Sequence, residues 1–268
     1  MRQNPAPFTS GYSVVIVANE KGGVGKSTLA SYIGCAASLE GASCMYFEID
    51  DQQRLQVLTG SPTVRIKMPN DEMILVNDQA VNETLDPLFT AVCSPQKVDL
   101  IIIDVGANTD LQFLQAAQML GIDKDAKDAG QSIAFVIPIT GSAECVSAGL
   151  RTAKRSKIAF PSADIQLSNM FFARDGVIAE QLSESNKEYR QLCELATTCF
   201  NFEALRPRTL HAFESMSTSL SSFAQMSKEL ISDRSGLPLF TAKSVHTQFM
   251  LHFVKVVSEV RRSLRFQR

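Results

Sequence analysis

The chain has 268 residues, of which 45% are hydrophobic and 20% are charged, and its formal net charge is −2. This balance excludes a chain that is disordered throughout and a protein that is held on nucleic acid by its overall charge, although a local basic patch stays possible. The uncharged stretch at residues 129–143 is too short and too polar for a membrane-spanning helix. Residues 1–7 lack the apolar core of a secretory signal, so we expect a cytoplasmic protein.

Cysteine and histidine usage indicates neither a disulfide frame nor a metal site. The six cysteines form no Cys-x-x-Cys pair, which is typical of buried thiols in a reducing compartment. The three histidines have no ligand-like spacing, so we interpret them as structural residues and expect no His/Cys metal site.

Apolar, β-branched runs alternate with helical patterns along the chain. Strands are expected at 12–18, 44–49, 100–103, 133–139 and 165–167, with a weaker strand at 199–205. Helices are expected at 26–39 and near 110–120, 143–157, 178–197 and 209–230. Strands that alternate with crossover helices predict an α/β fold, in which a mostly parallel twisted sheet carries helices on both faces.

The segment 52–97 is less regular than its surroundings. It contains several prolines and two short strand-like pieces, 63–67 and 73–76. We interpret it as an irregular excursion and not as a second domain, so that residues 1–268 form a single domain.

The strongest signal is a glycine-rich loop between the first strand and the first helix. Small residues let successive backbone N–H groups turn inward around phosphate oxygens, and the helix N-terminus adds its dipole. In such a loop Lys26 reaches the β- and γ-phosphates and the Ser27 hydroxyl faces Mg²⁺. The order of strand, loop, Lys-Ser and helix therefore predicts a P-loop NTPase domain. The loop reads Gly22-Gly23-Val24-Gly25-Lys26-Ser27-Thr28.

A second signal is the acidic end of the strand at 100–103, which runs into Asp104-Val105-Gly106. An apolar strand that ends in Asp has the form of a Walker B element, whose carboxylate holds Mg²⁺ directly or through water. Gly106 would let the backbone approach the γ-phosphate. The sequence therefore predicts Asp104 as a metal ligand.

The residue before the glycine-rich loop indicates which class of P-loop NTPase the sequence resembles. Lys21 precedes the two glycines, and the run from Lys21 to Thr28 resembles the deviant Walker A loop of the ParA/MinD family. The resemblance covers roughly residues 12–210 and implies an ATP-dependent homodimer, in which Lys21 reaches across the interface to the other subunit's nucleotide. The second strand ends in Glu48-Ile49-Asp50, where the family has Asp-x-Asp. This implies that Asp50 positions the attacking water and that Glu48 lies near the metal.

Two further matches to the family concern the base. The strand at 165–167 runs into Asn169, where the family places an Asn on the adenine, and Pro207 lies where the family's loop closes over the base. A GTP-specific site would have Asn-Lys-x-Asp, but the sequence here is Asn-Met-Phe-Phe from Asn169 onward, which disfavours guanine. The resemblance therefore implies ATP and Mg²⁺ as cofactors.

The C-terminal helix, expected at about 243–266, has one apolar stripe and a basic end. The preferred interpretation is a final helix that packs on the sheet with a solvated end. A second interpretation is non-specific DNA contact through Arg261, Arg262 and Arg265, as in relatives of ParA type, by neutralisation of phosphates. A membrane-surface helix of the MinD kind ranks last, so a membrane partner is not expected.

The resemblance implies an ATP-binding and slowly ATP-hydrolysing dimeric switch that a partner stimulates. Within the family, the sequence 104–108, the short middle segment and the basic C-terminal helix look most like the TraL- and StbB-type ATPases of plasmid stability and conjugative transfer, which would act through DNA and an unidentified protein partner. The sequence 19–23 also looks like MipZ-type division-site regulators. Two other classes stay open, a metabolic ATP-dependent ligase on the same fold and a nucleotide-bound adaptor that hardly hydrolyses, although Asp50 argues against the adaptor.

Overall fold

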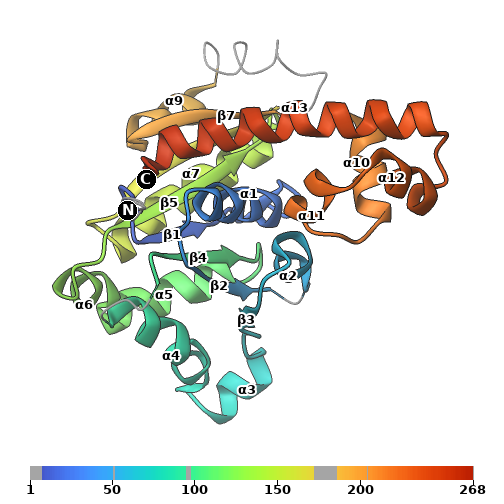
Figure 1. Cartoon of the computed structure of the whole chain (residues 1–268). Helices are drawn as coiled ribbons and strands as arrows, with labels where there is room; N and C mark the ends of the chain where they lie inside the picture. The colour runs from blue at the N-terminus through green and yellow to red at the C-terminus, as the bar shows by residue number, and fades with distance from the viewer. Residues whose placement is uncertain (1–7, 51, 95–97, 172–185, 204, 268) are drawn as a thin grey trace, which may run out of the picture.

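The computed structural model describes residues 8–50, 52–94, 98–171, 186–203 and 205–267. At its centre is a seven-stranded sheet in the order β3-β2-β4-β1-β5-β6-β7, in which each neighbouring pair is parallel. Figure 1 shows helices on both faces of this sheet. The strands are β1 (Val14–Val17), β2 (Cys44–Ile49), β3 (Thr63–Arg65), β4 (Leu100–Val105), β5 (Ile133–Ile139), β6 (Asp164–Phe171) and β7 (Thr198–Glu203). The predicted α/β fold with a parallel sheet is therefore confirmed.

The helices form two layers, one on each face of the sheet. Those that pack on the first face are α4 (Ala80–Cys93), α5 (Asp110–Leu120), α6 (Ile122–Asp128), α7 (Ala143–Ala159) and α9 (Lys187–Leu195). Those that pack on the second face are α1 (Lys26–Leu39), α2 (Arg54–Thr59), α10 (Pro207–Ser215), α11 (Leu220–Gln225), α12 (Lys228–Ser235) and α13 (Leu239–Leu264). A further short helix, α3 (Asp71–Val76), precedes α4.

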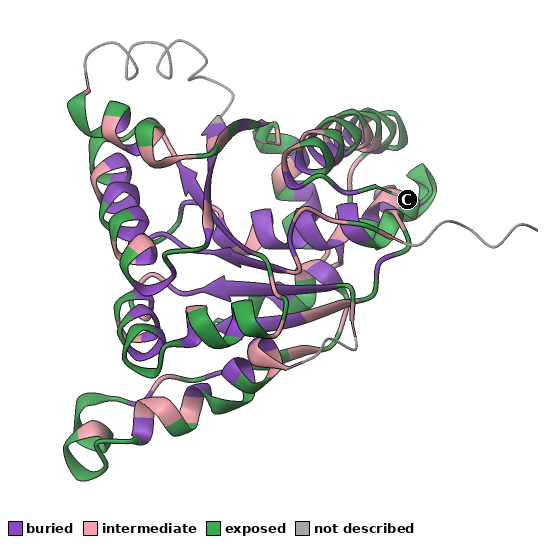
Figure 2. Cartoon of the chain, turned by 90° about the vertical axis from the view of Figure 1, so that its left-hand side faces the viewer, coloured by how far each residue is buried: buried purple, intermediate pink, exposed green. Residues whose placement is uncertain are grey.

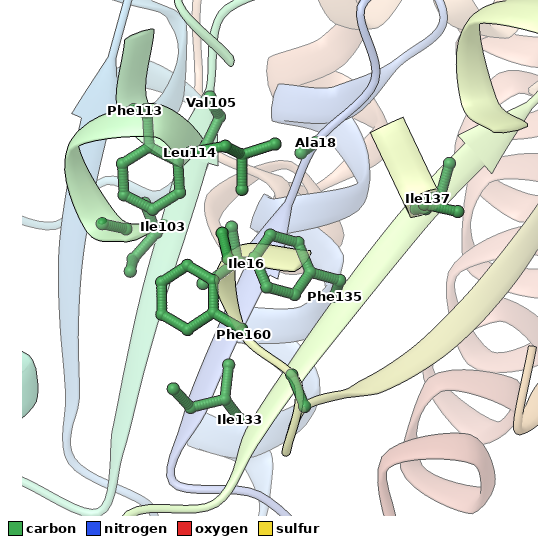
Figure 3. Packing of buried hydrophobic residues seen from close by; sticks show 14 of the residues in the cluster. Ile16, Ala18, Ile103, Val105, Phe113, Leu114, Ile133, Phe135, Ile137 and Phe160 are labelled. Atoms are coloured by element: carbon green, nitrogen blue, oxygen red, sulfur yellow. The ribbon is translucent and has the colours of Figure 1, made fainter. Parts of the chain in front are cut away.

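Successive side chains of each strand point to opposite faces of the sheet, so the hydrophobic core has two halves, one on each face. Buried strands carry apolar side chains on both faces, which is why they read as continuous hydrophobic runs in the sequence. On the first face Phe135 packs against Phe160 with ring centroids 5.3 Å apart, and Ile16 and Ile103 lie beside them (Figure 3). Figure 2 shows the strands largely buried and the outward sides of the helices exposed.

Strand order determines where the loops meet. β1 lies between β4 and β5, with Val17 paired to Asp104 on one side and to Val136 on the other. Glu48 on β2 is paired with Asp104 in turn. Because all strands are parallel, the loops that follow β1, β2 and β4 converge at the carboxyl edge of the sheet, where ligands bind in open α/β folds.

Two of the predicted elements differ in kind from the structure, and part of a third lies outside the described residues. The strand-like piece at 63–67 is β3, but the piece at 73–76 is the end of helix α3, which Asn70 caps by accepting a hydrogen bond from the Met73 amide. The helix expected near 209–230 is three short helices, since the chain turns at Ser217 (φ 44°) and two later serines cap new helices. In the helix expected at 178–197, residues 178–185 lie outside the described residues.

The C-terminal helix α13 is longer than the 243–266 predicted. It begins after Pro238 and ends where Arg265 takes a left-handed conformation (φ 56°). Its end returns to the start of the chain, because the Gly11 amide donates to the Leu264 carbonyl over 3.2 Å and Thr9 pairs with Gln267. No helix among the described residues combines the length and the apolarity that crossing a bilayer requires.

Candidate functional site

The glycine-rich loop joins β1 to α1 at the carboxyl edge of the sheet. Gly23 and Gly25 have φ values of 74° and 86°, a conformation that favours glycine. Gly25 is also the N-cap residue of α1 and makes no side-chain cap, so the first N–H groups of the helix have no side-chain partner there. A Cβ on Gly25 would lie 2.7 Å from the Met170 Cε, so packing against β6 also requires glycine.

A cavity of about 660 Å³ opens at this loop. Eight of the residues expected in the site line it, namely Lys21, Gly22, Gly23, Gly25, Lys26, Ser27, Thr28 and Asp50. Val24 is buried in the apolar core, 3% exposed, so its side chain anchors the loop from behind. The convergence of β1 and β2 at one edge thus brings the predicted phosphate loop and the predicted water-positioning carboxylate to one cavity.

Lys26 is buried, with 8% of its surface exposed. Its Nζ donates hydrogen bonds to the backbone carbonyls of Asn19 at 3.0 Å and Lys21 at 3.1 Å. Burial lowers the pKa of Lys26, and the charges of Asp104 and Asp50 oppose that shift. A buried cation whose hydrogen bonds go to neutral carbonyls is well placed to accept an anionic ligand.

Asp104 at the end of β4 is 2% exposed, and its Oδ2 has no hydrogen-bond partner among the described residues. Burial raises the pKa of Asp104 to about 7, with the charge of Glu48 in the same direction, whereas a hydrogen bond from Ser27 and the charge of Lys26 lower it. An orphaned carboxylate oxygen beside a hydroxyl is a hard oxygen donor set of the kind that Mg²⁺ takes with its waters. The residues present therefore fit a magnesium ion at Asp104 and Ser27.

Glu48, predicted near the metal, has a structural task in this fold. It is 2% exposed, and its Oε1 accepts from the backbone amides of Arg54 and Leu55, both at 2.9 Å. The carboxylate thus caps the N-terminus of α2, whose N-cap residue makes no side-chain cap. Glu48 is the cross-strand neighbour of Asp104 but is not among the residues that line the cavity.

Asp50 lies two residues beyond Glu48, past the end of β2, and lines the cavity. Its Oδ1 accepts from the Gln52 amide at 3.3 Å. The loop after β4 crosses close by, since the Gly106 amide donates to the Ile49 carbonyl at 2.8 Å and a Cβ on Gly106 would lie 3.1 Å from the Asp50 Cγ. A larger residue at position 106 would therefore crowd the Asp50 side chain.

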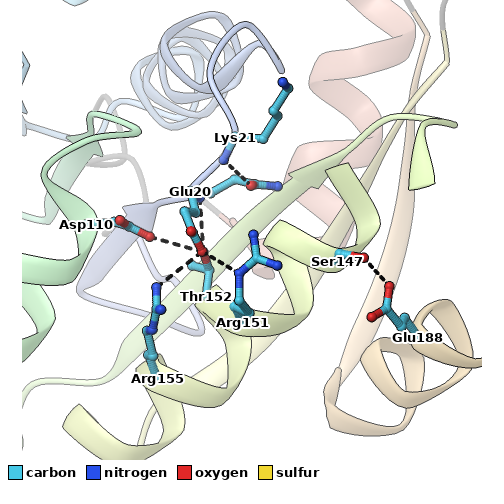
Figure 4. A network of polar contacts seen from close by, with 9 residues as sticks. Glu20, Lys21, Asp110, Ser147, Arg151, Thr152, Arg155 and Glu188 are labelled. Atoms are coloured by element: carbon cyan, nitrogen blue, oxygen red, sulfur yellow. Dashed lines mark hydrogen bonds and ion pairs between the residues drawn. The ribbon is translucent and has the colours of Figure 1, made fainter. Parts of the chain in front are cut away.

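Lys21 lies at the rim of the cavity, where its Nζ forms an ion pair with Glu144 Oε1 at 2.8 Å. Helix α7 supplies this partner. The preceding residue of the loop, Glu20, pairs with Arg151 at 2.8 Å and with Arg155 at 3.2 Å, and both arginines also belong to α7 (Figure 4). The start of the loop is thus bound to α7 by ion pairs of both polarities: the loop supplies the cation in one pair and the anion in the others.

A buried hydrogen-bond chain joins the same loop to α5. The Glu20 amide donates to Thr152 Oγ1 at 3.1 Å, and the Thr152 hydroxyl donates to Asp110 Oδ2 at 3.2 Å (Figure 4). Burial raises the pKa of Asp110, and the hydrogen bond from Thr152 lowers it. Sequence analysis missed this network, because its members come from three distant segments.

Asn169 and Pro207, expected at the base, do not line the cavity. The Asn169 side chain donates to Asn201 Oδ1 at 3.3 Å and accepts from the Tyr189 hydroxyl at 3.4 Å, on the α9 side of the sheet. Its neighbour Met170 points to the other face and lines the cavity. The strand period of two gives the reason, since adjacent side chains point to opposite faces.

The far wall of the cavity comes from residues that sequence analysis did not single out. Phe202, Leu205, Leu210 and His252 line it, together with Tyr32 of α1. His252 bonds through Nδ1 to the Tyr32 hydroxyl at 3.0 Å and through Nε2 to the Glu203 carbonyl. Burial lowers the pKa of His252, which the carbonyl and charge of Glu203 oppose. No local motif marks these residues, because α13 returns to the sheet only in the folded chain.

The C-terminal arginines lie at the opposite, amino edge of the sheet. Arg261 forms an ion pair with Glu40 at 2.8 Å, and the Glu40 side chain is only 11% exposed. Arg262 pairs with Glu259 on its own helix, and the Arg265 side chain lies against Gly11. DNA contact through these residues stays a prediction, and the structure gives each of the three an intramolecular neighbour.

One family model and several solved structures are similar to this chain. Residues 13–121 match the family model of ATPase MipZ. The structure of a Cyanothece McdA variant in complex with ATP is 14% identical, with a TM-score of 0.52 over 97% of this chain and 99% of that one, and Cyanothece apo McdA is 14% identical, with a TM-score of 0.50 over 94% and 99%. MinD cell division protein of Aquifex aeolicus is 12% identical, with a TM-score of 0.47 over 84% and 95%.

A comparison with curated proteins finds no match. The McdA likeness shows the fold, and the family model covers β1, the phosphate loop, β2 and β4 with the carboxylates that end them. The part of the chain that carries the phosphate loop and these carboxylates is therefore similar to ATPase MipZ.

Proposed function

We propose that this protein binds ATP with Mg²⁺, hydrolyses it slowly and acts as a nucleotide-dependent dimeric switch. The observation that carries the proposal is the convergence of three groups at the glycine-rich loop. The buried Lys26 and the partly exposed Asp50 line one cavity, and the orphaned carboxylate of Asp104 lies beside Ser27 of its lining. A binding module without turnover would need Lys26 and Asp104 but not Asp50.

Each group has a distinct chemical task. Lys26 exchanges its two carbonyl partners for phosphate oxygens, which compensate its charge better than neutral carbonyls do. Ser27 and Asp104 would hold Mg²⁺, and the ion would neutralise charge that develops on the phosphates. Asp50 positions the attacking water from the open side of the cavity.

The position of Lys21 supports the proposed dimer. Its ammonium lies at the rim of the cavity with 39% of the side chain exposed, so it is accessible to a second subunit once it leaves Glu144. We infer that ATP bridges two subunits through this lysine, as the family resemblance implies.

The process that we infer is plasmid partition, stability or conjugative transfer, through DNA and a protein partner. The family match to ATPase MipZ supports a second candidate, a division-site regulator of the MipZ or MinD kind. Both candidates share the switch and differ in what the ATP-bound dimer holds.

One experiment tests the shared switch and separates the candidates. ATP turnover is measured alone, with duplex DNA and with anionic vesicles, for the wild-type protein and for Lys26→Ala. We expect slow Mg²⁺-dependent turnover in the wild type and none in Lys26→Ala, whose nucleotide affinity falls by roughly tenfold or more, as for the loss of a hydrogen bond to a charged group. Lys154→Ala, an exposed lysine of α7, serves as the control. Equal ATP affinity in Lys26→Ala and wild type, by calorimetry, would refute the site.

A further inference from the structure

A second hollow lies between α4 and the corner that joins α5 to α6, on the face of the molecule away from α13 (Figure 1). We call it the α4–α6 groove. It has a volume of about 700 Å³, and its floor and walls include Phe89 and Ile122, which are each 5% exposed, and Leu120, which is 43% exposed. Gln79, Asn82 and Thr90 also line the groove, so its apolar surface is confined to the floor and to the exposed leucine at its edge.

Carboxylates stand on both walls of this groove. Glu83 and Asp86 come from α4, three residues apart on one helix face, and Asp125 comes from α6. Glu83 accepts a hydrogen bond from Asn77 at 3.0 Å, and no ion pair among the described residues involves any of the three carboxylates. The sequence 68–94 contains five carboxylates and neither lysine nor arginine.

These features define the chemistry of an occupant. An apolar floor with acidic walls is complementary to an amphipathic helix that has basic flanks, since such helices bind by laying their apolar face into a groove. Opposite charge at the rim speeds encounter and selects partners. Duplex DNA and anionic lipid surfaces carry the wrong sign of charge for these walls.

We propose that the α4–α6 groove binds a basic amphipathic helix of a partner protein. Helix α5 connects this groove to the cavity at the phosphate loop, because Leu120 at its end lines the groove and Thr109 at its start lines the cavity. Asn108 and Thr109 also line a smaller hollow of about 260 Å³ with residues 68–71, at the base of the α3–α4 segment. An effect of the partner on ATP turnover, transmitted by α5, rests on the proposed function, whereas the docking itself does not.

Docking is tested by fluorescence anisotropy with a labelled synthetic peptide of leucine and lysine, about 18 residues long, whose leucines follow the i, i+3, i+4, i+7 spacing. No nucleotide is present, so the result is independent of the ATP site. We expect the wild type to bind the peptide and the double variant Asp86→Lys with Asp125→Lys to bind it at least about tenfold more weakly, because like charges at an interface are strongly unfavourable.

Matched controls separate the groove from general electrostatics. The double variant Glu194→Lys with Asp233→Lys changes the net charge equally at two exposed positions on α9 and α12 and is expected to bind the peptide as the wild type does. A scrambled peptide of the same composition is expected to bind weakly. If circular dichroism shows that the lysine variant does not fold, the milder pair Asp86→Asn with Asp125→Asn replaces it, with weaker binding than wild type again expected.

Three outcomes would overturn the proposal. The first is equal affinity of the groove variant and the charge-matched control. The second is equal binding of the ordered and scrambled peptides. The third is wild-type binding of a leucine–glutamate peptide of the same spacing as tightly as of the leucine–lysine peptide, which would exclude charge complementarity as the cause of binding.

Discussion

Asp50 and Glu48 show how two carboxylates at the end of one strand acquire different tasks. Glu48 is buried and accepts hydrogen bonds from two amides of α2, whereas Asp50 lies past the strand end and faces the cavity. A carboxylate whose oxygen already accepts two backbone hydrogen bonds is costly to redirect. Asp50 therefore remains the residue with freedom to orient water.

Replacement of Asp50 by Ala should spare nucleotide binding and slow turnover by roughly 10²-fold or more, the range for a positioned acid–base group. ATP affinity is measured by calorimetry and turnover by phosphate release. Glu48→Gln is the comparison, since it keeps one capping oxygen and should leave turnover within a few-fold of wild type. Wild-type turnover in Asp50→Ala would transfer the water-positioning role to another residue.

The burial of His252 predicts the sign of its contribution to the pH dependence of folding stability. Burial lowers the pKa of His252 in the folded chain below its ordinary value near 6.5, so the unfolded chain binds more protons at mildly acidic pH. The stability that neutral His252 contributes is therefore full above about pH 6.5 and is lost as the pH falls toward the folded-state pKa.

We expect the free energy of unfolding of the wild type to fall more steeply between about pH 7 and pH 5 than that of His252→Gln. Urea unfolding at several pH values measures this difference in slope. His211→Gln is the control, because His211 is exposed on α10. Parallel pH profiles for the wild type and His252→Gln would show that the bonds to Tyr32 and to the Glu203 carbonyl do not depend on a neutral ring.

At the scale of elements, the loop between β1 and α1 is shaped by backbone conformation as much as by side chains. Gly25 has a φ of 86° and faces Met170 across a gap that a Cβ would close to 2.7 Å. Helix α1 begins directly after it, so any adjustment of Gly25 moves the N–H groups that would surround phosphate.

Gly25→Ala should lose most nucleotide affinity and reduce the free energy of unfolding by about 1–2 kcal/mol, the cost of a left-handed conformation for a residue with a Cβ. Adding Met170→Ala removes the clash but not the backbone strain, so we expect it to restore little of either. Calorimetry with ATP and urea unfolding measure the two quantities. Full rescue by the second substitution would show that the clash with Met170, and not the φ of Gly25, is what matters.

At the scale of the whole molecule, the sheet separates two charged regions. The phosphate loop lies at the carboxyl edge, and the end of α13 lies at the amino edge, tied to residues 9–11. Arg261 forms an ion pair with Glu40, whose side chain is mostly buried. The Arg262 side chain is 73% exposed and pairs with Glu259 of its own helix. Substitution of Arg262 therefore tests DNA binding, whereas substitution of Arg261 also tests folding stability.

Arg262→Glu should lower ATP-dependent affinity for duplex DNA and flatten its dependence on salt, if this end contacts phosphates, and should lower the thermal midpoint less than Arg261→Glu does, because the Arg262 side chain is more exposed. Arg261→Glu should lower the thermal midpoint as well, because Glu40 then faces a like charge. Anisotropy of a labelled duplex at several salt concentrations, and thermal unfolding, provide the two readouts. DNA affinity that is unchanged in Arg262→Glu would reduce the basic end to a solvated helix terminus.

Local patterns in the sequence determined most of the framework. Helix α1, strand β2, helix α5 and strand β5 have the predicted bounds, because each is specified by an apolar period or by a glycine at its end. The phosphate loop, Asp50 and Asp104 could be predicted for the same reason, since each lies within a few residues of a strand end, and their roles in binding and hydrolysis stay predictions.

Tertiary structure decided what distant segments do to one another. The orientation of Asn169 away from the cavity depends on the register of β6, and a shift of one residue inverts every side chain of a strand. The wall with Phe202 and His252 exists only because α13 returns to the sheet. The segment read as strand at 73–76 is helical because the Asn70 cap outweighs the β-propensity of a short apolar run. Local sequence therefore determines where strands end and loops begin. The face to which a side chain points, the walls of the cavity and the partners in ion pairs depend on contacts between residues far apart in the chain.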